Sequence, residues 1–435
     1  MQGLFTHRIF LVTSFLTLLC FGMVSKGFGA AANSRPNIIW IIADDLGYGD
    51  LGSYGCRDIP TPHIDSIASQ GIRCTNFYAA APICSPSRAS MLTGQYPETH
   101  GIGGALMGKG GFRQGTVTIA ECLKQSGYAT GLVGKWHLGY AGEALPNSRG
   151  FEEFYGHRGG KIDFFEHTDT AQKVEGNPMG KHDFFENDTE IFPKGYSTDL
   201  FTDRAIRFVE NHKSTPFFLV VSYNAPHYSR GGVLQAPENI LKRFTKGKKP
   251  TDREKYTAMV SCMDDGIGRL MECLSREGLD ENTMVIFVSD NGADPKHGGS
   301  NGALSAGKWT YREGGIRVPM VAKWPASIPA NRTVPDSIHM IDFFPTMLRA
   351  SGTTFPVKAK IEGVDVMDCL RGEAKVSERV LHFGNTTLMM GKWKLFEDKL
   401  YDIENDPTEQ KDQAALQPAI FTNLKDHLGR YTSGR

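Results

Sequence analysis

The sequence predicts an α/β protein with one large, mixed and mostly parallel sheet flanked by helices, followed by a small C-terminal α+β region. Apolar runs over residues 36–45, 217–223 and 284–290 each end in polar residues, which is typical of strands buried on both faces of a parallel sheet. Helical stretches lie between these runs, so strands and helices alternate along the chain. After about residue 355 the pattern changes to short strands with tight turns, which predicts a short antiparallel sheet.

Start signals place the expected helices. Thr61 is a favoured N-cap residue and Pro62 suits the first helical position, so a helix is expected over 61–71. A second helix, over 118–127, is followed by a strand over 129–133. Later helices are expected over 198–211, 253–277 and 418–431, and the C-terminal strands over 379–384, 387–396 and 399–403.

Residues 141–197 have no clear period and are rich in glycine, histidine, lysine and aromatic residues. We interpret them as functional loops. Within them, Lys161, Asp163 and His167 are candidates for contacting a substrate.

Residues 1–31 have the pattern of a secretory signal peptide, with Arg8, an apolar run over 9–24 and small residues at the end. The run is short of the roughly 20 residues that span a bilayer, and this favours export over a membrane anchor. We therefore expect an exported protein, periplasmic or extracellular, with a large domain over 32–355 and a small C-terminal subdomain over 356–435.

Charge gives no reason to expect a nucleic-acid or membrane-surface partner. Removing the signal peptide takes away Arg8 and Lys26 and no acid, so Lys+Arg falls from 48 to 46 against 48 Asp+Glu. The expected mature chain is therefore close to neutral, and no second apolar run in it is long enough to span a membrane.

Eight cysteines are present. Cys20 lies in the signal peptide, where lipoprotein attachment is an alternative, although the residue before it fits poorly. In an exported protein, Cys56 and Cys74 are the first pair to consider for a disulfide. Cys262 and Cys273 share one expected helix, and eleven residues at about 1.5 Å each place them ~16 Å apart, too far to bridge.

The most informative segment reads Cys84-Ser85-Pro86-Ser87-Arg88 and continues to Leu92-Thr93-Gly94. Ser85 is a good N-cap residue and Pro86 suits the first helical position, so a helix is expected to begin here. Unpaired N–H groups and the helix dipole favour negative charge at such an end, so a phosphate or sulfate group could dock against Cys84. Arg88, four residues on, returns to roughly the same face.

Carboxylate and amide side chains follow two of the expected strands. Asp44 and Asp45 end the first, and Asp290 and Asn291 end the last of the large sheet. Ligands gather outside the carboxyl ends of strands in such sheets, which also places His227 nearby. Hard oxygen donors without sulfur or imidazole suit calcium or magnesium.

The Cys-x-Pro-x-Arg string leading to Leu-Thr-Gly resembles the signature of type I sulfatases, the formylglycine-dependent members of the alkaline phosphatase superfamily. The resemblance runs from about residue 35 to 410 and implies an alkaline-phosphatase-like sandwich with a catalytic domain over 32–355. It implies that a formylglycine-generating enzyme oxidises Cys84, and that one cation is bound, Ca²⁺ rather than Mg²⁺. The implied ligands are Asp44, Asp45, Asp290, Asn291 and the oxygen of residue 84.

Further residues receive roles from the same resemblance. Residues 134–139, Gly-Lys-Trp-His-Leu-Gly, match a family string in which Lys135 clamps sulfate and His137 is a base. His227 and Lys308 match a histidine and a lysine that face the sulfate or the leaving group. Together with Cys84 and Arg88, these residues form the implied catalytic set.

These observations predict an exported, calcium-dependent enzyme that hydrolyses sulfate esters of a carbohydrate. A phosphonate or phosphate ester hydrolase of the same superfamily is one alternative. A non-catalytic protein that binds sulfated glycans is another, and it applies if Cys84 is not oxidised. The sequence indicates neither the sugar, nor exo or endo action, nor an oligomeric state.

Overall fold

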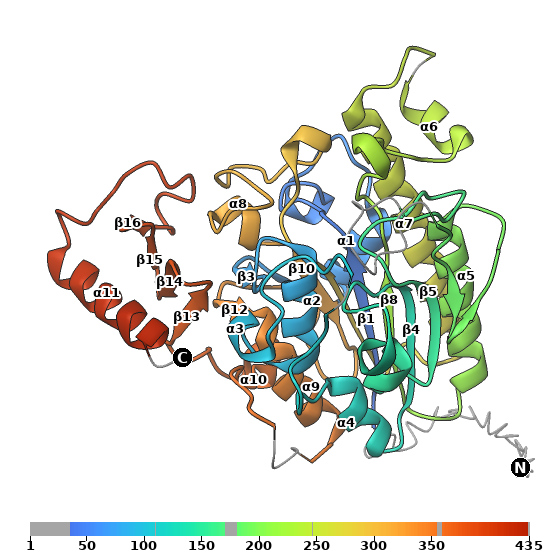
Figure 1. The fold of residues 1–435 in the computed structure, drawn as a ribbon, viewed down its shortest axis with the longest axis horizontal. Helices are drawn as coiled ribbons and strands as arrows, with labels where there is room; N and C mark the ends of the chain where they lie inside the picture. Colours follow the sequence, from blue (N-terminus) through green and yellow to red (C-terminus); the bar gives the residue numbers. More distant parts are fainter. Residues whose placement is uncertain (1–34, 109, 170–180, 246, 355–358, 434–435) are drawn as a thin grey trace, which may run out of the picture. The chain divides into compact units, whose positions relative to one another are not determined.

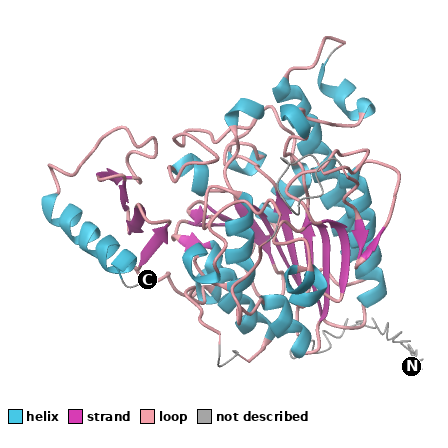
Figure 2. Cartoon of the chain, viewed as in Figure 1, coloured by secondary structure: helices cyan, strands magenta, loops and turns pink. Residues whose placement is uncertain are grey.

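The computed structural model describes residues 35–108, 110–169, 181–245, 247–354 and 359–433, so the expected signal peptide lies outside it. The predicted α/β class is confirmed, because helices flank a ten-stranded mixed sheet (Figures 1 and 2). In order across the sheet, the strands are β11 (Arg332–Val334), β2 (Ile72–Cys74), β10 (Met320–Lys323), β9 (Thr283–Ser289), β1 (Asn37–Ala43), β8 (Phe217–Ser222), β4 (Ala129–Lys135), β5 (Glu153–His157), β6 (Phe185–Glu186) and β7 (Thr189–Glu190).

The five central strands, from β9 to β5, run parallel, so their carboxyl ends share one edge of the sheet. β10 pairs antiparallel with β9 and makes the sheet mixed. Strand β5 corrects the interpretation of 141–197 as loops alone, since it pairs with β4 from Gly131 to Lys135. Its five residues are too few to show a period, which is why the sequence did not indicate it.

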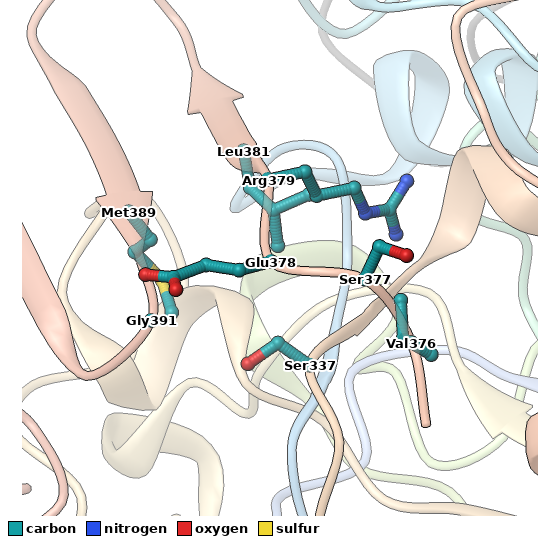
Figure 3. Close-up of a pocket in the computed structure, with 8 residues that line it drawn as sticks. All are labelled: Ser337, Val376, Ser377, Glu378, Arg379, Leu381, Met389 and Gly391. Carbon is teal, nitrogen blue, oxygen red and sulfur yellow. The ribbon is translucent and has the colours of Figure 1, made fainter. Parts of the chain in front are cut away.

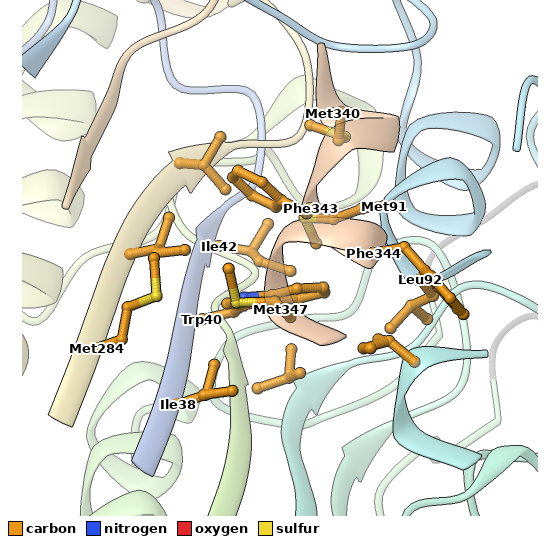
Figure 4. Packing of buried hydrophobic residues seen from close by; sticks show 14 of the residues in the cluster. Ile38, Trp40, Ile42, Met91, Leu92, Met284, Met340, Phe343, Phe344 and Met347 are labelled. Atoms are coloured by element: carbon orange, nitrogen blue, oxygen red, sulfur yellow. The ribbon is translucent and has the colours of Figure 1, made fainter. Parts of the chain in front are cut away.

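The parallel strands are buried on both faces, which explains their unbroken apolar runs. Along β1, Ile38, Trp40 and Ile42 belong to one core cluster, while Ile39 and Ile41 belong to the other. Figure 4 shows the first cluster around Trp40. The helices on that face are α2 (Cys84–Thr93), α4 (Ile119–Gln125), α9 (Phe343–Ser351) and α10 (Met367–Arg371); those on the other are α1 (Pro62–Ser69), α5 (Ser197–His212) and α7 (Asp252–Arg276).

The two predicted helices α4 and α1 are capped in different ways. Thr118 caps α4 through a capping box with Glu121. Thr61 precedes α1 as expected, but its hydroxyl caps none of the helix N–H groups. Asp264 of α7 does so instead, because its carboxylate accepts the first free N–H groups of α1, 3.1 Å from His63 and 2.8 Å from Ile64.

The C-terminal part forms a separate antiparallel sheet, as predicted, packed against one helix. The expected single strand over 387–396 is wrong, because the chain turns back at Gly391, whose φ of 57° is left-handed. The elements are β13 (Val380–Phe383), β14 (Thr387–Met390), β15 (Trp393–Phe396), β16 (Lys399–Asp402) and α11 (Pro418–Ser433).

Short elements complete the described chain. None of the helices within the described ranges is both long and apolar enough to cross a membrane. The short elements are the pair β3 (Phe77–Tyr78) and β12 (Ile338–His339), the helices α3 (Pro97–His100), α6 (Glu238–Thr245) and α8 (Glu313–Ile316), and 3-10 turns at Gly52–Tyr54, Gly142–Ala144, Pro146–Arg149, Arg230–Gly232, Pro295–His297 and Met340–Asp342.

Cys56 and Cys74, the first pair to consider for a disulfide, are both free thiols. Cys74 lies in the core cluster around Trp40, whereas Cys56 packs against the cluster on the other face of the sheet. The two side chains therefore lie in different cores. Cys262 and Cys273 are also free, as expected from their positions on α7.

A buried ion cluster joins the C-terminal sheet to α8. Lys394 of β15 lies 2.9 Å from Glu313 Oε1 and 3.0 Å from Glu409 Oε1, and all three side chains are buried. The other oxygen of Glu409 accepts the N–H of Glu313 at 2.8 Å. Lys394 is thus a cation that pairs with both buried carboxylates and offsets the repulsion between them.

We expect Lys394→Ala to lower the free energy of unfolding by about 3 kcal/mol, because it leaves two buried carboxylates without this cation. Lys392→Ala is the matched control, since Lys392 is 41% exposed in its pair with Asp402 and its loss should cost within about 1 kcal/mol. Urea unfolding of both variants measures the difference. Equal midpoints would show that the cluster is not needed for stability.

Candidate active site

The predicted oxygen donors meet at the carboxyl ends of β1 and β9. Asp44 and Asp45 follow β1, and Asp290 and Asn291 follow β9. Because these strands are neighbours, the two pairs touch. The Asn291 amide donates to Asp45 Oδ1 at 2.7 Å, and the Asp45 backbone N–H donates to Asp290 Oδ1 at 3.2 Å. All four side chains are buried.

Helix α2 brings Cys84 to the same place, although it starts differently from the prediction. Ile83 is the N-cap residue, Cys84 is the first helical residue, and Ser85 does not cap. Ser85 Oγ instead donates to the carbonyl of His137 at 2.9 Å and accepts the N–H of Leu106 at 3.0 Å. The hydroxyl thus ties the helix start to the segment after β4. Cys84 therefore lies within the first turn rather than just before the helix, and this end of the helix still favours an anion.

The Cys84 thiol lies between opposite charges. Its Sγ is 3.4 Å from Asp44 Oδ1 and 3.8 Å from Lys308 Nζ. Burial, reinforced by Asp44, raises the pKa of this thiol above its ordinary value. The sulfur therefore keeps its proton at neutral pH, and a protonated thiol is a poor nucleophile.

Three buried cations face three carboxylates in the site. Although burial opposes ionisation, the charges of Lys135 and Arg88 hold the pKa of Asp44 well below its ordinary value. Carboxylates in the site hold the guanidinium of Arg88 and the ammonium groups of Lys135 and Lys308 in place, where these groups can bind an anion. The pairs are Arg88 Nε with Asp290 Oδ2 at 2.8 Å, Lys135 Nζ with Asp44 Oδ2 at 2.7 Å, and Lys308 Nζ with Asp45 Oδ2 at 2.7 Å.

The donor set fits a hard divalent cation. Ligand atoms of Asp44, Asp45, Cys84 and His227 all lie within 4.8 Å of one another, and all four residues are buried. Asn291 Oδ1 is buried and accepts no hydrogen bond from the described residues, while its amide nitrogen is used. A buried carbonyl oxygen without a donor costs free energy, and a cation would satisfy it. Carboxylate and amide oxygens are the ligands that calcium and magnesium prefer.

His137 presents a free acceptor atom. Its Nε2 lies 3.1 Å from the Leu106 carbonyl, which can only accept, so the proton sits on Nε2. Nδ1 is then an acceptor, and it is buried without a hydrogen-bond partner among the described residues. Burial and the charge of Lys135 lower the pKa of His137 well below its ordinary value, so the ring is neutral. A neutral imidazole with an open Nδ1 can accept a proton.

His227 is oriented the opposite way. Its Nδ1 lies 2.7 Å from the Tyr228 carbonyl and must donate to it, so Nε2 accepts from Lys308 Nζ at 3.1 Å. Burial and Lys308 lower the pKa of His227 to about 4. At Lys308, burial lowers the pKa but the charge of Asp45 outweighs this effect. The pKa of Lys308 is therefore raised well above its ordinary value. In this geometry Lys308 holds the proton and His227 orients it.

A cavity of about 60 Å³ opens above Cys84, and His137, His227, Lys308 and Lys161 line it. Lys161 is therefore the one predicted substrate residue that the structure places in this cavity. Its Nζ lies 4.9 Å from the ring centre of Tyr228, which lines the same cavity.

Asp163 and His167 contact the loop itself. Asp163 accepts the N–H groups of Phe165 and Glu166 at 2.9 and 2.8 Å. His167 is buried, with Nε2 at 3.1 Å from the Gly195 carbonyl. These contacts shape the loop around the cavity, and a direct role of either residue in binding substrate stays a prediction.

Two parts of the site were not predicted. Ser222, the last residue of β8, accepts from Arg88 Nη1 at 2.6 Å and donates to the Lys135 backbone carbonyl at 2.7 Å, so it ties the Arg88 guanidinium to the end of β4. A polar residue at the end of an apolar strand was its only signal. Trp309 and Tyr228 line the cavity mouth, and each directly follows a predicted site residue in the sequence.

Other clusters in the described chain serve the fold. A cavity of about 240 Å³ beside β13 is lined by Glu378 and Arg379 among others (Figure 3), but the Arg379 guanidinium pairs with buried Asp342. A cluster of His63, Asp264 and Asp265 includes the carboxylate that caps α1.

Comparison with known proteins gives consistent results. A family model described as "Sulfatase" matches residues 36–353. The chain is 33% identical over 350 residues to arylsulfatase J of Mus musculus, which covers 79% of this chain and 57% of that protein. It is 32% identical over 399 residues to N-acetylgalactosamine-6-sulfatase of Canis lupus familiaris, covering 85% and 73%. Steryl-sulfatase of Mus musculus is 31% identical over 440 residues, covering 82% and 69%.

Solved structures share the fold. The crystal structure of Ps i-CgsB in complex with k-i-k-neocarrahexaose matches with a TM-score of 0.83 and 31% identity, covering 92% of this chain and 93% of that chain. The family resemblance of the Cys84 segment is thereby confirmed over the whole α/β sheet.

Proposed function

Because the chain belongs to the sulfatase family, we propose that it hydrolyses sulfate esters, with an aldehyde made from Cys84 and a bound Ca²⁺. The observation that carries the proposal is the position of Cys84. Its side chain lies at a helix start, between Asp44 and Lys308, on the floor of a cavity. An anionic ester that enters this cavity meets Lys308, Lys161 and the proton acceptor His137, while Lys135 pairs with Asp44 directly beside Cys84.

We propose that Asp44, Asp45, Asp290 and Asn291 hold the cation together with the oxygen of residue 84. When bound, Ca²⁺ would supply positive charge that lowers the pKa of a hydroxyl on residue 84 and draws off the charge of the sulfate. Calcium is favoured over magnesium because the set is all protein oxygen, whereas magnesium keeps several waters. Lys135 and Lys308 are then free to turn from Asp44 and Asp45 toward the sulfate.

The Cys84 thiol is protonated, and it could not easily release a sulfate once bound to it. An aldehyde at this position avoids both difficulties. The formylglycine-generating enzyme, with an external oxidant, is expected to replace the thiol by an aldehyde before the protein acts. Once hydrated, that aldehyde carries two hydroxyl groups, one to attack sulfur and one whose proton is removed to expel sulfate.

Each remaining step falls to a residue whose geometry suits it. Arg88, Lys135 and Lys308 bind the sulfate oxygens and take up charge as it moves to the leaving oxygen. Lys308, oriented by His227, gives a proton to the departing alcohol when the sulfur–oxygen bond breaks, and the proton that the attacking hydroxyl loses returns to Lys308. His137 Nδ1 then accepts the proton of the second hydroxyl as sulfate departs and the aldehyde returns. Water that rehydrates the aldehyde completes the balance.

We further propose a sulfated carbohydrate as the substrate, in an exported, periplasmic or extracellular protein. Support comes from the signal-peptide pattern of residues 1–31 and from the solved relative in complex with k-i-k-neocarrahexaose. The relative named N-acetylgalactosamine-6-sulfatase points the same way, whereas the relative named steryl-sulfatase indicates that a steroid must be tested as well.

A panel of esters tests this function on protein made in its native host, where the aldehyde can form. The panel contains N-acetylgalactosamine 6-sulfate, k-i-k-neocarrahexaose, a steroid sulfate, an aryl sulfate and the matching aryl phosphate. We expect sulfate release, fastest from a sugar. Faster cleavage of the phosphate would overturn the sulfatase assignment, and a preference for the steroid would overturn the carbohydrate part alone.

For His137→Ala we expect kcat to fall by roughly 10²–10⁴-fold, the usual worth of a general base. Because this histidine acts only after the alcohol has left, the first turnover should still release alcohol rapidly. Stopped-flow measurement with an aryl sulfate should therefore show a burst of about one alcohol per enzyme, followed by a slow steady state. His100→Ala is the control, since His100 is buried away from the cavity and hydrogen-bonds Ser90. Absence of the burst would place His137 in the first step instead.

A further inference from the structure

Trp309 is an exposed aromatic side chain at the mouth of the cavity. It is 57% exposed, and of the large apolar side chains that stand exposed on the described chain, it is the one that lines the Cys84 cavity. Its neighbour in sequence is Lys308, whose Nζ lies 5.2 Å from the centre of the Trp309 ring. The ring therefore stands beside the group that we propose protonates the leaving alcohol.

The backbone of Trp309 is strained and held in place. Its φ of 77° lies in the left-handed region, which costs a bulky residue of order 1–3 kcal/mol. Hydrogen bonds fix this conformation, because the Trp309 N–H donates to the Pro82 carbonyl and the Lys308 N–H to the Ala293 carbonyl, each at 3.0 Å. Glycine would adopt the same φ without strain. Apart from its contact with Lys308, this exposed indole belongs to none of the core clusters of the described chain, which points to a role at the cavity.

The size of the cavity shows what can reach this ring. A volume of about 60 Å³ holds a few water-sized groups. A sulfate group fills such a volume, so the sugar ring that carries it extends toward Trp309, which lines the same cavity. Once sulfate is seated against Cys84 and Lys308, the group that carries it extends past Trp309 and Tyr228, which line the same cavity.

We propose that Trp309 is a stacking platform for the sugar ring of the leaving group, an inference that rests on the proposed function and names its substrate contact. The apolar C–H face of a pyranose lies flat on an aromatic ring, and Trp offers the largest such surface at little entropic cost. Tyr228 faces the same mouth, and its ring is held by stacking on His297 with centroids 3.9 Å apart. The geometry thus selects esters whose sulfate is attached to a ring.

Trp309→Gly tests the platform, because it removes the ring and relieves the backbone strain. For the sugar sulfate that the wild type cleaves fastest in the panel, we expect kcat/KM to fall about tenfold or more, mainly through KM. Inorganic sulfate occupies the part of the cavity next to Cys84 and carries no ring to stack on Trp309. It should therefore inhibit the variant and the wild type with the same inhibition constant. Trp309→Phe should restore most of the loss. The melting temperature of Trp309→Gly should not fall, which separates this role from a structural one.

Phe192→Ala is the matched control, since Phe192 is 70% exposed but does not line the cavity; it should leave kcat/KM unchanged. If the wild type cleaves the sugar sulfate and Trp309→Gly cleaves it equally well, the platform is wrong and the proposed function stands. A weaker inhibition by inorganic sulfate would also overturn the platform, since it would show damage to the inner cavity. A wild type that cleaves no sugar sulfate overturns the carbohydrate proposal and the platform together.

Discussion

Cys84→Ala should release no measurable sulfate, with kcat at least ~10⁴-fold below that of the wild type, because the side chain that becomes the nucleophile is gone. The fold should survive. Cys84 is the first residue of α2, where alanine is accepted, and we expect the free energy of unfolding to change by within about 1 kcal/mol. Sulfate release and urea unfolding, measured on the same preparation, separate the two effects.

Cys122→Ala is the control for this variant. Cys122 is a free and buried thiol on α4, so its loss removes the same atoms from a place without catalytic groups. It should keep full activity. Cys84→Ser sharpens the test further, because a serine hydroxyl can attack sulfur once but has no second hydroxyl with which to expel sulfate. We expect at most one alcohol per enzyme from it, and continued turnover by Cys84→Ser would contradict the role of the aldehyde.

Asp290→Asn should lower activity about a thousandfold, or roughly 4 kcal/mol of transition-state stabilisation, because a ligand charge is lost from the cation site. Asparagine has nearly the same size as aspartate, so its side-chain amide still reaches Arg88. Metal analysis of the purified protein should show less bound Ca²⁺, and added Ca²⁺ should restore part of the activity.

The control for Asp290→Asn is Asp264→Asn, which changes an equally buried aspartate whose carboxylate caps α1. It should lower stability and leave both Ca²⁺ content and kcat alone. Wild-type protein treated with excess chelator should lose activity and regain it with Ca²⁺. Full activity of Asp290→Asn in excess chelator would show that these four oxygen donors do not hold the cation.

The parallel strands and the site at their ends could be predicted because both follow from local patterns. Runs such as the one in β1 are apolar at every position since both faces are buried, and the acids that end them share one edge by topology. The sequence did not predict strand β5 or the break of the C-terminal strand at Gly391, because strands of four or five residues show too little periodicity.

Other features depend on partners that are remote in sequence. Asp264 caps α1 from about 200 positions away, and Ser85 leaves its expected capping role because the carbonyl of His137 and the N–H of Leu106 lie beside it. The candidate Cys56–Cys74 pair forms no disulfide for the same reason, since only the three-dimensional sheet separates the two thiols. Local spacing carries no information about such contacts.

In the proposed function, residue 84 acts as an aldehyde rather than as a thiol. Mass analysis of the tryptic peptide that contains it, from active protein made in the native host, tests this most directly. We expect the mass of the aldehyde or its hydrate, and the fraction of the peptide that carries it should rise with specific activity. Fully active protein whose Cys84 is entirely unmodified would contradict this expectation.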